Sequence, residues 1–168
     1  MKRNLFFSQL TVFFFALYVC PSCNTNSGSG DEEVIRSLYN QWEIAASGKD
    51  LNKIMSFYAP NDTAVFYDAF PPREYKGTNA YRKDYENFFA TFSGSMKSVI
   101  SDLNVHAVGN LAYVYGIDTW TIAGQEQPMI FRFTDVLEKI NGKWLIVHEH
   151  LSFPVDPVTG KADFSSKI

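Results

Sequence analysis

The sequence has few cysteines, no surplus of positive charge and no long apolar run. Both cysteines, Cys20 and Cys23, lie near the start, so the rest of the chain offers no disulfide framework, thiolate metal site or cysteine nucleophile. The net charge of −3 argues against nucleic-acid binding, which needs a basic surface. No apolar stretch reaches about 18 residues without polar interruption, which excludes a protein with several membrane spans. The 168 residues, 46% hydrophobic, predict one globular domain with an extension.

The first thirty residues are typical of an export signal. A short basic start precedes the apolar stretch 5–19, and the cysteines follow at once. This order resembles a bacterial lipoprotein signal, so we expect a protein held in the periplasm or outer membrane by a lipid anchor. A plainly secreted protein and an uncleaved anchor are the alternatives. The expected segments are a signal peptide over 1–23, lipidated at Cys23 or else at Cys20, and a flexible tether over 24–30.

Three helices are predicted next, from apolar side chains at helical spacing. The first covers residues 31–47, Asp50 can cap the second, and the third starts near Thr78 with a broad aromatic stripe. A short strand over 63–67 lies between the second and the third. The expected inward residues are Val34, Leu38, Trp42 and Ala45, then Leu51, Ile54, Met55 and Tyr58, and finally Tyr81, Tyr85, Phe88, Phe89 and Phe92.

After Gly94 the hydrophobic period changes to two, which is typical of strands. Turn residues separate four long strands, and Asn141-Gly142 is the strongest hairpin signal. Adjacent hairpins imply an antiparallel meander, and helices gathered before it imply an α+β fold. The expected strands cover 98–107, 111–122, 129–140 and 143–153, and the polar tail over 154–168 is expected to be loose.

The order of elements, with NGKWLIVHEHLS at 141–152, is similar to the SnoaL-like part of the nuclear transport factor 2-like superfamily. Residues 63–89 resemble the strand, loop and third helix of the association domain of calcium/calmodulin-dependent kinase II. The resemblance covers residues 31–153. It implies a cone-shaped fold, with three N-terminal helices packed on a strongly curved antiparallel sheet around a pocket. The spaced pattern typical of the group consists of Trp144, Ile146, His148, His150 and Ser152.

The candidate pocket residues follow from strand parity, because alternate residues face opposite sides of a sheet. The resemblance favours a pocket face with Tyr115, Asp135 and Glu149, with Tyr81 and Trp42 as further ligand contacts. Since Asp135 lies among apolar side chains, its pKa can be raised, which makes it a candidate general base with Glu149 as partner.

The opposite face of the last strand carries two histidines, His148 and His150, which could share a metal ion. No third ligand has motif spacing, so we expect no metal, and no glycine spacing indicates a nucleotide cofactor. His148 is a further catalytic candidate, and Arg132 with both histidines is the alternative ligand-binding set. We otherwise expect a structural network of Arg132, Thr134, Asp118, His148 and His150.

The sequence departs from two pocket patterns of the superfamily. Basic pocket residues of the kinase association domain align with Tyr81, Tyr115, Asp135 and Leu151, and none of these four is basic. In the epoxide hydrolases an arginine stands at the place of Phe133. We therefore expect neither a carboxylate-binding pocket nor hydrolase chemistry, but an apolar, acidic pocket for a neutral or cationic small molecule.

Three functions remain open, because the fold implied by the resemblance hosts many activities. The first is an exported binding module that holds a small, mostly apolar ligand. The second is a cofactor-free isomerase, cyclase or lyase that uses a pocket carboxylate or a histidine. The third is an oligomeric assembly hub. A homodimer or higher homo-oligomer is expected in each case, because Trp120, Trp144 and Ile146 would form an apolar patch on the exposed sheet face.

Overall fold

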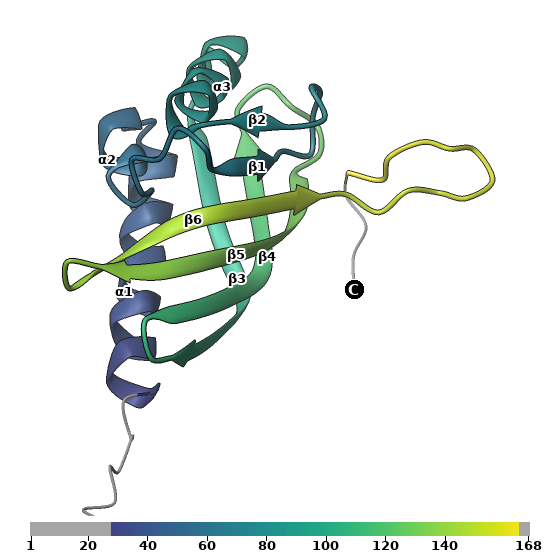
Figure 1. The fold of residues 1–168 in the computed structure, drawn as a ribbon. Coiled ribbons are helices and arrows are strands. Elements are labelled where there is room, and N and C mark those ends of the chain that lie inside the picture. Colours follow the sequence, from purple (N-terminus) through teal and green to yellow (C-terminus); the bar gives the residue numbers. More distant parts are fainter. Residues whose placement is uncertain (1–27, 165–168) are drawn as a thin grey trace, which may run out of the picture.

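The computed structural model describes residues 28–164, which form three helices and a six-stranded sheet (Figure 1). The expected signal peptide and most of the tether lie outside the described residues. Helices precede the long strands, so the predicted α+β class is confirmed. The helices are α1 (Gly28–Ser47), α2 (Leu51–Met55) and α3 (Thr78–Thr91), and the strands are β1 (Val65–Tyr67), β2 (Tyr75–Lys76), β3 (Met96–Val108), β4 (Leu111–Ile122), β5 (Met129–Ile140) and β6 (Lys143–Ser152).

The sheet has the strand order β2-β1-β6-β5-β4-β3. Strands β3 to β6 form the predicted antiparallel meander. The turn between β5 and β6 places Asn141 at φ 50° and Gly142 at φ 79°, as a hairpin with two left-handed residues requires. Strand β1 pairs with β6 in parallel, so the sheet is mixed rather than purely antiparallel. Strand β2 was not predicted, because two residues carry no period.

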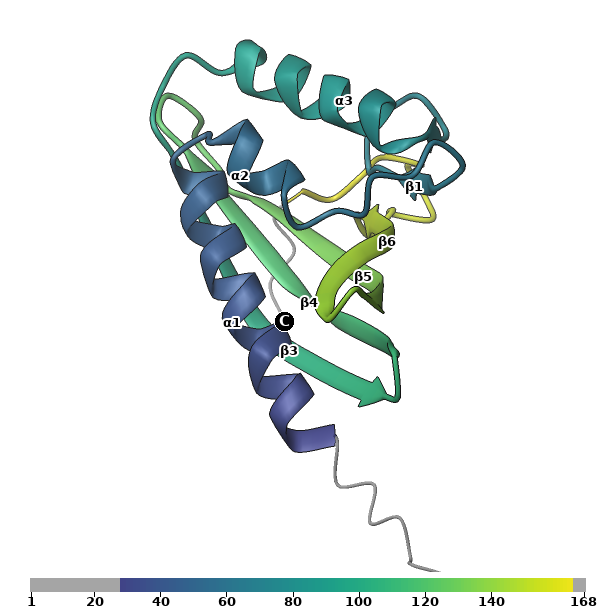
Figure 2. The same ribbon diagram turned by 60° about the vertical axis from the view of Figure 1, so that its left-hand side comes forward.

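Helix α1 packs its apolar stripe on the inner face of the sheet, the face turned toward the helices (Figure 2). Val34 is 56% exposed, and Ile35 takes its place in the buried stripe with Leu38 and Trp42. Asp31 fixes the start of the helix, because its carboxylate accepts bonds from Lys139 Nζ at 2.7 Å and Trp144 Nε1 at 3.1 Å. Helix α3 crosses one end of the sheet (Figure 2).

A bulge between β5 and β6 changes which residues of β6 face the helices. Val136 pairs with His148, but the next residue, Leu137, pairs with Ile146, so one residue of β6 is unpaired. Trp144, Ile146 and Glu149 therefore all face inward, although their numbers differ in parity. The expected apolar patch on the exposed face is wrong: Trp120 and Trp144 are 4% exposed and Ile146 is 1% exposed.

Residues 154–164 differ from the loose tail that the sequence predicts. They form a turn closed by a bridge between Val155 and Ala162. Ile130 N donates to Phe164 O at 2.8 Å, and the Phe164 ring lies 4.7 Å from that of Phe153. The segment is therefore attached to the end of the sheet.

Candidate functional site

A cavity lies between the inner face of β4 to β6 and the helices α1 and α3. The space between its lining atoms is about 660 Å³, a volume that includes the open mouth. Most of the wall is aromatic, and five carboxyl groups interrupt it. The lining residues are Tyr39, Trp42, Asp68, Phe70, Asp84, Tyr85, Phe88, Ile100, Asp118, Trp120, Phe131, Phe133, Asp135, Glu149 and Leu151.

The deepest carboxyl groups of the cavity are those of Asp135 and Glu149, which lie directly opposite each other on β5 and β6. Both are buried, at 1% and 4% exposure, and their carboxyls are hydrogen-bonded to each other. Two carboxyls can bond in this way only when they share a proton. Burial, and next the charge of Glu149, raise the pKa of Asp135 well above its usual range, so Asp135 carries that proton.

Tyrosine hydroxyls hold this carboxyl pair from the helix side. Tyr39 donates to Asp135 Oδ2 at 2.5 Å, Tyr58 donates to Glu149 Oε2 at 2.8 Å, and Tyr81 donates to Glu149 Oε1. Burial raises the pKa of Glu149, whereas the bonds from Tyr81, Tyr58 and Asp135 oppose that rise. Three donors therefore stabilise the ionised form of Glu149, and the pair holds one negative charge.

Asp118 forms a second acidic point in the cavity wall, on β4. It is 5% exposed and accepts bonds from Ser98 Oγ at 2.7 Å and Trp120 Nε1 at 2.5 Å. Burial raises the pKa of Asp118 to about 7, although both hydrogen bonds lower it. Its charge therefore changes near neutral pH.

Asp68 and Asp84 form a third acidic point, supplied by the loop after β1 and by α3. Their carboxyls are hydrogen-bonded to each other, and Tyr75 donates to Asp84 Oδ1 at 2.6 Å. Burial raises the pKa of Asp68 to about 7, and the charge of Asp84 adds to the rise. This pair, like the deeper one, therefore keeps a proton at a higher pH than an exposed carboxylate does.

Two buried polar atoms of the described residues lack a usual hydrogen-bond partner: the Trp42 Nε1–H group has no acceptor, and no N–H or hydroxyl group donates to Asp135 Oδ1. Both side chains line the cavity. A buried polar atom without a partner costs free energy, so such an atom beside a cavity marks a place where a ligand can bond.

The structure brings together Trp42, Asp135 and Glu149 of the predicted pocket residues. Tyr81 lies behind the cavity wall, where it supports Glu149. The expected place of Tyr115 is wrong: it pairs with Thr134, faces away from the helices and is 42% exposed.

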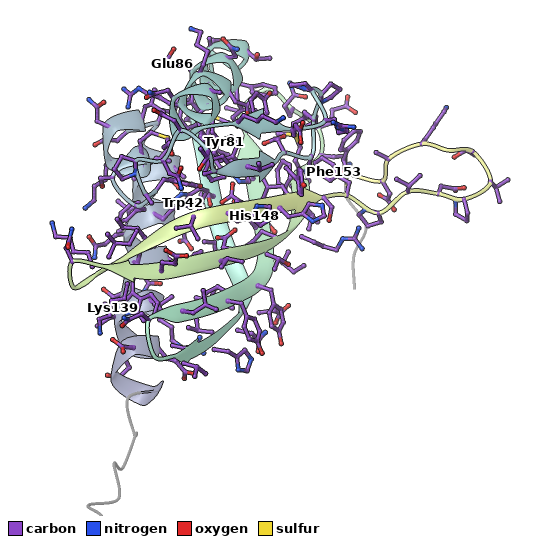
Figure 3. The ribbon with its side chains drawn as sticks, in the orientation of Figure 1. Trp42, Tyr81, Glu86, Lys139, His148 and Phe153 are labelled. Carbon is purple, nitrogen blue, oxygen red and sulfur yellow. The ribbon has the colours of Figure 1, made fainter. Side chains whose placement is uncertain are left out.

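The alternative ligand set lies on the outer face of the sheet, the face turned away from the helices. Arg132 donates to Phe153 O at 3.0 Å, and His148 Nδ1 lies 2.5 Å from Val65 O (Figure 3). His150 is exposed and its ring meets that of Tyr67. The predicted network with Asp118 is wrong, because Asp118 faces the cavity on the other side.

Sequence reasoning missed several residues of the site. Tyr39 is three residues before Trp42 on α1, and this helical spacing could have revealed it. Asp118 alternates with Trp120 along β4, which was also visible. Asp84 lies at helical spacing from Tyr81 and Phe88, so the aromatic stripe could have revealed it, whereas Asp68 lies in a loop without a period and only the fold brings it to the site.

The charge of the lining residues has one sign. None of the residues that line the cavity, all from the described part of the chain, is Lys, Arg or His.

Within residues 28–164, no His, Cys, Asp and Glu side chains gather in a group suited to a metal ion. The same part of the chain has no helix long and apolar enough to cross a membrane.

Comparison with known proteins gives a consistent result. The model of the SnoaL-like domain family matches residues 35–156. A solved structure of an NTF2-like protein of unknown function from Pseudomonas putida KT2440 is 32% identical, with a TM-score of 0.77, and the match covers 83% of this chain and 97% of that one. A search of curated proteins finds no match.

Two further solved structures show the range of proteins with this fold. A candidate calcium/calmodulin-dependent protein kinase II association domain from Xanthomonas campestris is 25% identical, covering 70% of this chain and 84% of that one, with a TM-score of 0.60. A candidate scytalone dehydratase from Novosphingobium aromaticivorans is 16% identical, covering 73% and 83%, also with a TM-score of 0.60.

Proposed function

Because the chain belongs to the SnoaL-like domain family of the nuclear transport factor 2-like superfamily, we propose that it is a binding module for a small, mostly apolar molecule. The observation that carries the proposal is the cavity, which combines an aromatic wall with a few buried polar groups. Such a composition is typical of small-molecule sites, where apolar surface supplies affinity and polar groups set orientation.

The charge of the cavity limits the ligand to neutral or cationic molecules. Asp118, Asp135 and Glu149 would repel an anion at short range, and the low polarity of the surroundings strengthens that repulsion. The test is a thermal-shift and native mass-spectrometry screen with acidic, neutral and basic ring compounds. Selective binding of carboxylates would contradict the proposal and would direct attention to Arg132 on the outer face.

Catalysis is the second candidate function, and the raised pKa values of two carboxyls favour it. The pKa values of Asp68 and Asp118 are raised to about 7, which suits a group that both takes and gives a proton at neutral pH. In this case the domain would be a cofactor-free isomerase, cyclase or lyase. One solved structure of the same fold is described as a candidate dehydratase.

A proton-exchange measurement separates catalysis from binding without a known substrate. Phenylacetone, a ketone with acidic C–H groups, is incubated with the protein in deuterium oxide and followed by nuclear magnetic resonance. An enzyme with a pocket base accelerates the exchange, and Asp118→Asn abolishes the acceleration. Exchange at the rate of buffer alone contradicts catalysis and leaves the binding module.

Self-association and export complete the proposal. The outer face of the sheet exposes Tyr113 (51%) and Tyr115 (42%), which suits a homodimer built through that face or a larger assembly hub.

We also expect export and a lipid anchor at Cys23 or Cys20. A labelled-lipid assay tests this: Cys23→Ser should release the protein from membranes, and retention of label there would assign the lipid to Cys20.

A further inference from the structure

We propose that the ligand is an organic ammonium ion whose N–H group donates to Asp135 Oδ1 in place of the proton that Asp135 shares with Glu149. This inference rests on the proposed function and narrows its ligand class from neutral or cationic to cationic. On binding, the ammonium ion keeps its own protons, Asp135 loses its proton to solvent, and a hydrogen bond from nitrogen to Asp135 Oδ1 replaces the bond between the carboxyls.

The first support is Asp135 Oδ1, an oxygen to which no N–H or hydroxyl group of the described residues donates. Oδ2 accepts from Tyr39, whereas Oδ1 receives no bond from an N–H or hydroxyl group of the described residues. The side chain is 1% exposed and lines the cavity, so a donor from a ligand is the group that can reach it. An ammonium ion supplies such donors, which an ether, a hydrocarbon or a carboxylate does not.

The second support is negative charge that no nearby cation balances. Glu149 holds the charge of the deep pair, and Asp118 on β4 adds a further charge above neutral pH. Elsewhere in the lining, Asp84 and Asp68 share a second proton. A cation in the cavity therefore meets carboxyl groups from several lining elements, and their charges offset the cost of removing it from water.

The third support is the aromatic wall beside these charges. Trp42 and Trp120 meet edge to face at 6.2 Å, and Phe88 lies 5.3 Å from Trp120. The ring faces of such residues attract cations, and tryptophan does so most strongly. The wall therefore suits the organic part of an ammonium ion, while Trp42 Nε1 remains available to an oxygen of the same ligand.

The proposal predicts that binding depends on pH. The groups that face Asp135 are Tyr39 from α1, Asp118 from β4 and Glu149 from β6, and Tyr58 and Tyr81 reach Glu149. The tyrosine pKa values are raised by burial, so these hydroxyls keep their protons. Because binding releases a proton from the carboxyls, affinity should rise with pH, by up to about tenfold per pH unit, over the range in which the free protein keeps the proton on Asp135.

The test compares three probes of one shape: benzylamine, benzyl alcohol and benzoate. Isothermal titration calorimetry in two buffers with different ionisation heats measures both affinity and proton release. We expect benzylamine to bind at least about tenfold more tightly than benzyl alcohol, benzoate not to bind, and protons to be released with benzylamine alone.

Two variants and a control locate the effect. Asp118→Asn should weaken benzylamine binding by about tenfold and leave benzyl alcohol within about twofold, since it removes only charge. Asp135→Asn should abolish most of the proton release, and circular dichroism verifies that it folds. Asp62→Asn removes a carboxylate from an exposed loop outside the cavity lining and should change neither quantity.

Each contrary result has a distinct meaning. Equal binding of benzylamine and benzyl alcohol, or benzylamine binding without proton release, overturns this inference and leaves the binding module intact. Failure of all three probes to bind overturns the inference and counts against the proposed function as well.

Discussion

At the scale of single residues, the buried carboxyls of the site lower their total negative charge by keeping or sharing protons. Asp135 and Glu149 share one proton, and Asp68 and Asp84 share another, so four carboxyls hold fewer than four charges. Asp118 has no carboxyl partner and relies on Ser98 and Trp120. The folded state therefore holds protons that the unfolded chain releases, and stability must depend on pH.

The free energy of unfolding should fall as the pH rises from about 4 to about 7. Asp118 has an ordinary pKa of 3.8 and a folded pKa of about 7, so its protonated form favours folding below that window and the contribution is lost through it. The loss is about 4 kcal/mol at most, since one pKa unit corresponds to about 1.4 kcal/mol. Urea unfolding at several pH values measures it.

Asp118→Asn should reduce the slope of the unfolding free energy against pH by an amount equivalent to about one bound proton, because asparagine does not titrate. Part of the slope should remain, since Asp68, Asp135 and Glu149 also have raised pKa values. Asp62→Asn, on the exposed loop, is the matched control and should keep the slope of the wild type. A slope that is unchanged in Asp118→Asn would contradict the assignment.

At the scale of the elements, sequence patterns predicted the bounds of the strands well, but predicted less well which face of each strand is buried. The bounds of β4 and β5 match the prediction, because alternation and turn residues define each strand locally. The face of Tyr115 could not be derived, since alternation divides a strand into two faces but does not say which of them is turned toward the helices. The bulge in β6 was hidden too, because its extra residue, Val147, is as apolar as the Ile146 before it and carries no turn signal.

The close packing of β4 against β5 makes Gly116 sensitive to substitution. A Cβ atom there would lie 3.0 Å from Phe133 Cε1 and 3.0 Å from Ser101 O, closer than ordinary contacts. Gly116→Ala should therefore destabilise the fold by about 1–3 kcal/mol. Chemical unfolding measures the loss. Gly30→Ala, with no atom within 4 Å of the added Cβ, is the control, and equal stability of both variants would contradict the packing argument.

The C-terminal segment 154–164 should be held mainly by Phe164. Its ring stacks on Phe70 and meets Phe153. Phe164→Ala should speed tryptic cleavage at Lys161 severalfold while changing the free energy of global unfolding by less than about 1 kcal/mol, because local opening is separate from unfolding of the core. Gel electrophoresis follows the cleavage. Val158→Ala, at a side chain 92% exposed, should cleave like the wild type.

At the scale of the whole molecule, the two faces of the sheet differ in what they contact. The inner face and the helices enclose the cavity, and the outer face carries the histidines and exposed tyrosines. His106, Tyr113 and Tyr115 stack there, with ring centroids 4.7 Å and 6.4 Å apart along the row. A surface of this kind can bury apolar area in an assembly without disturbing the cavity.

We expect a homodimer or larger assembly through the outer face. Tyr113→Glu places a charge in the middle of the stack and should shift light-scattering mass toward the monomer at micromolar concentration. Glu126→Gln, at an exposed position in a turn, should leave the mass unchanged. A wild-type protein that is monomeric at that concentration would contradict the prediction.

The pair of Trp42 and Trp120 makes the cavity observable by optical spectroscopy. The chain has three tryptophans, and these two meet edge to face at the cavity, whereas Trp144 lies 5.6 Å from Lys139 Nζ near the start of α1. Coupled indole transitions should give a paired signal in ultraviolet circular dichroism. An occupant of the cavity should alter that signal and the emission of two fluorophores while leaving the third as an internal reference. The domain thus contains its own reporter of occupancy, with no added dye.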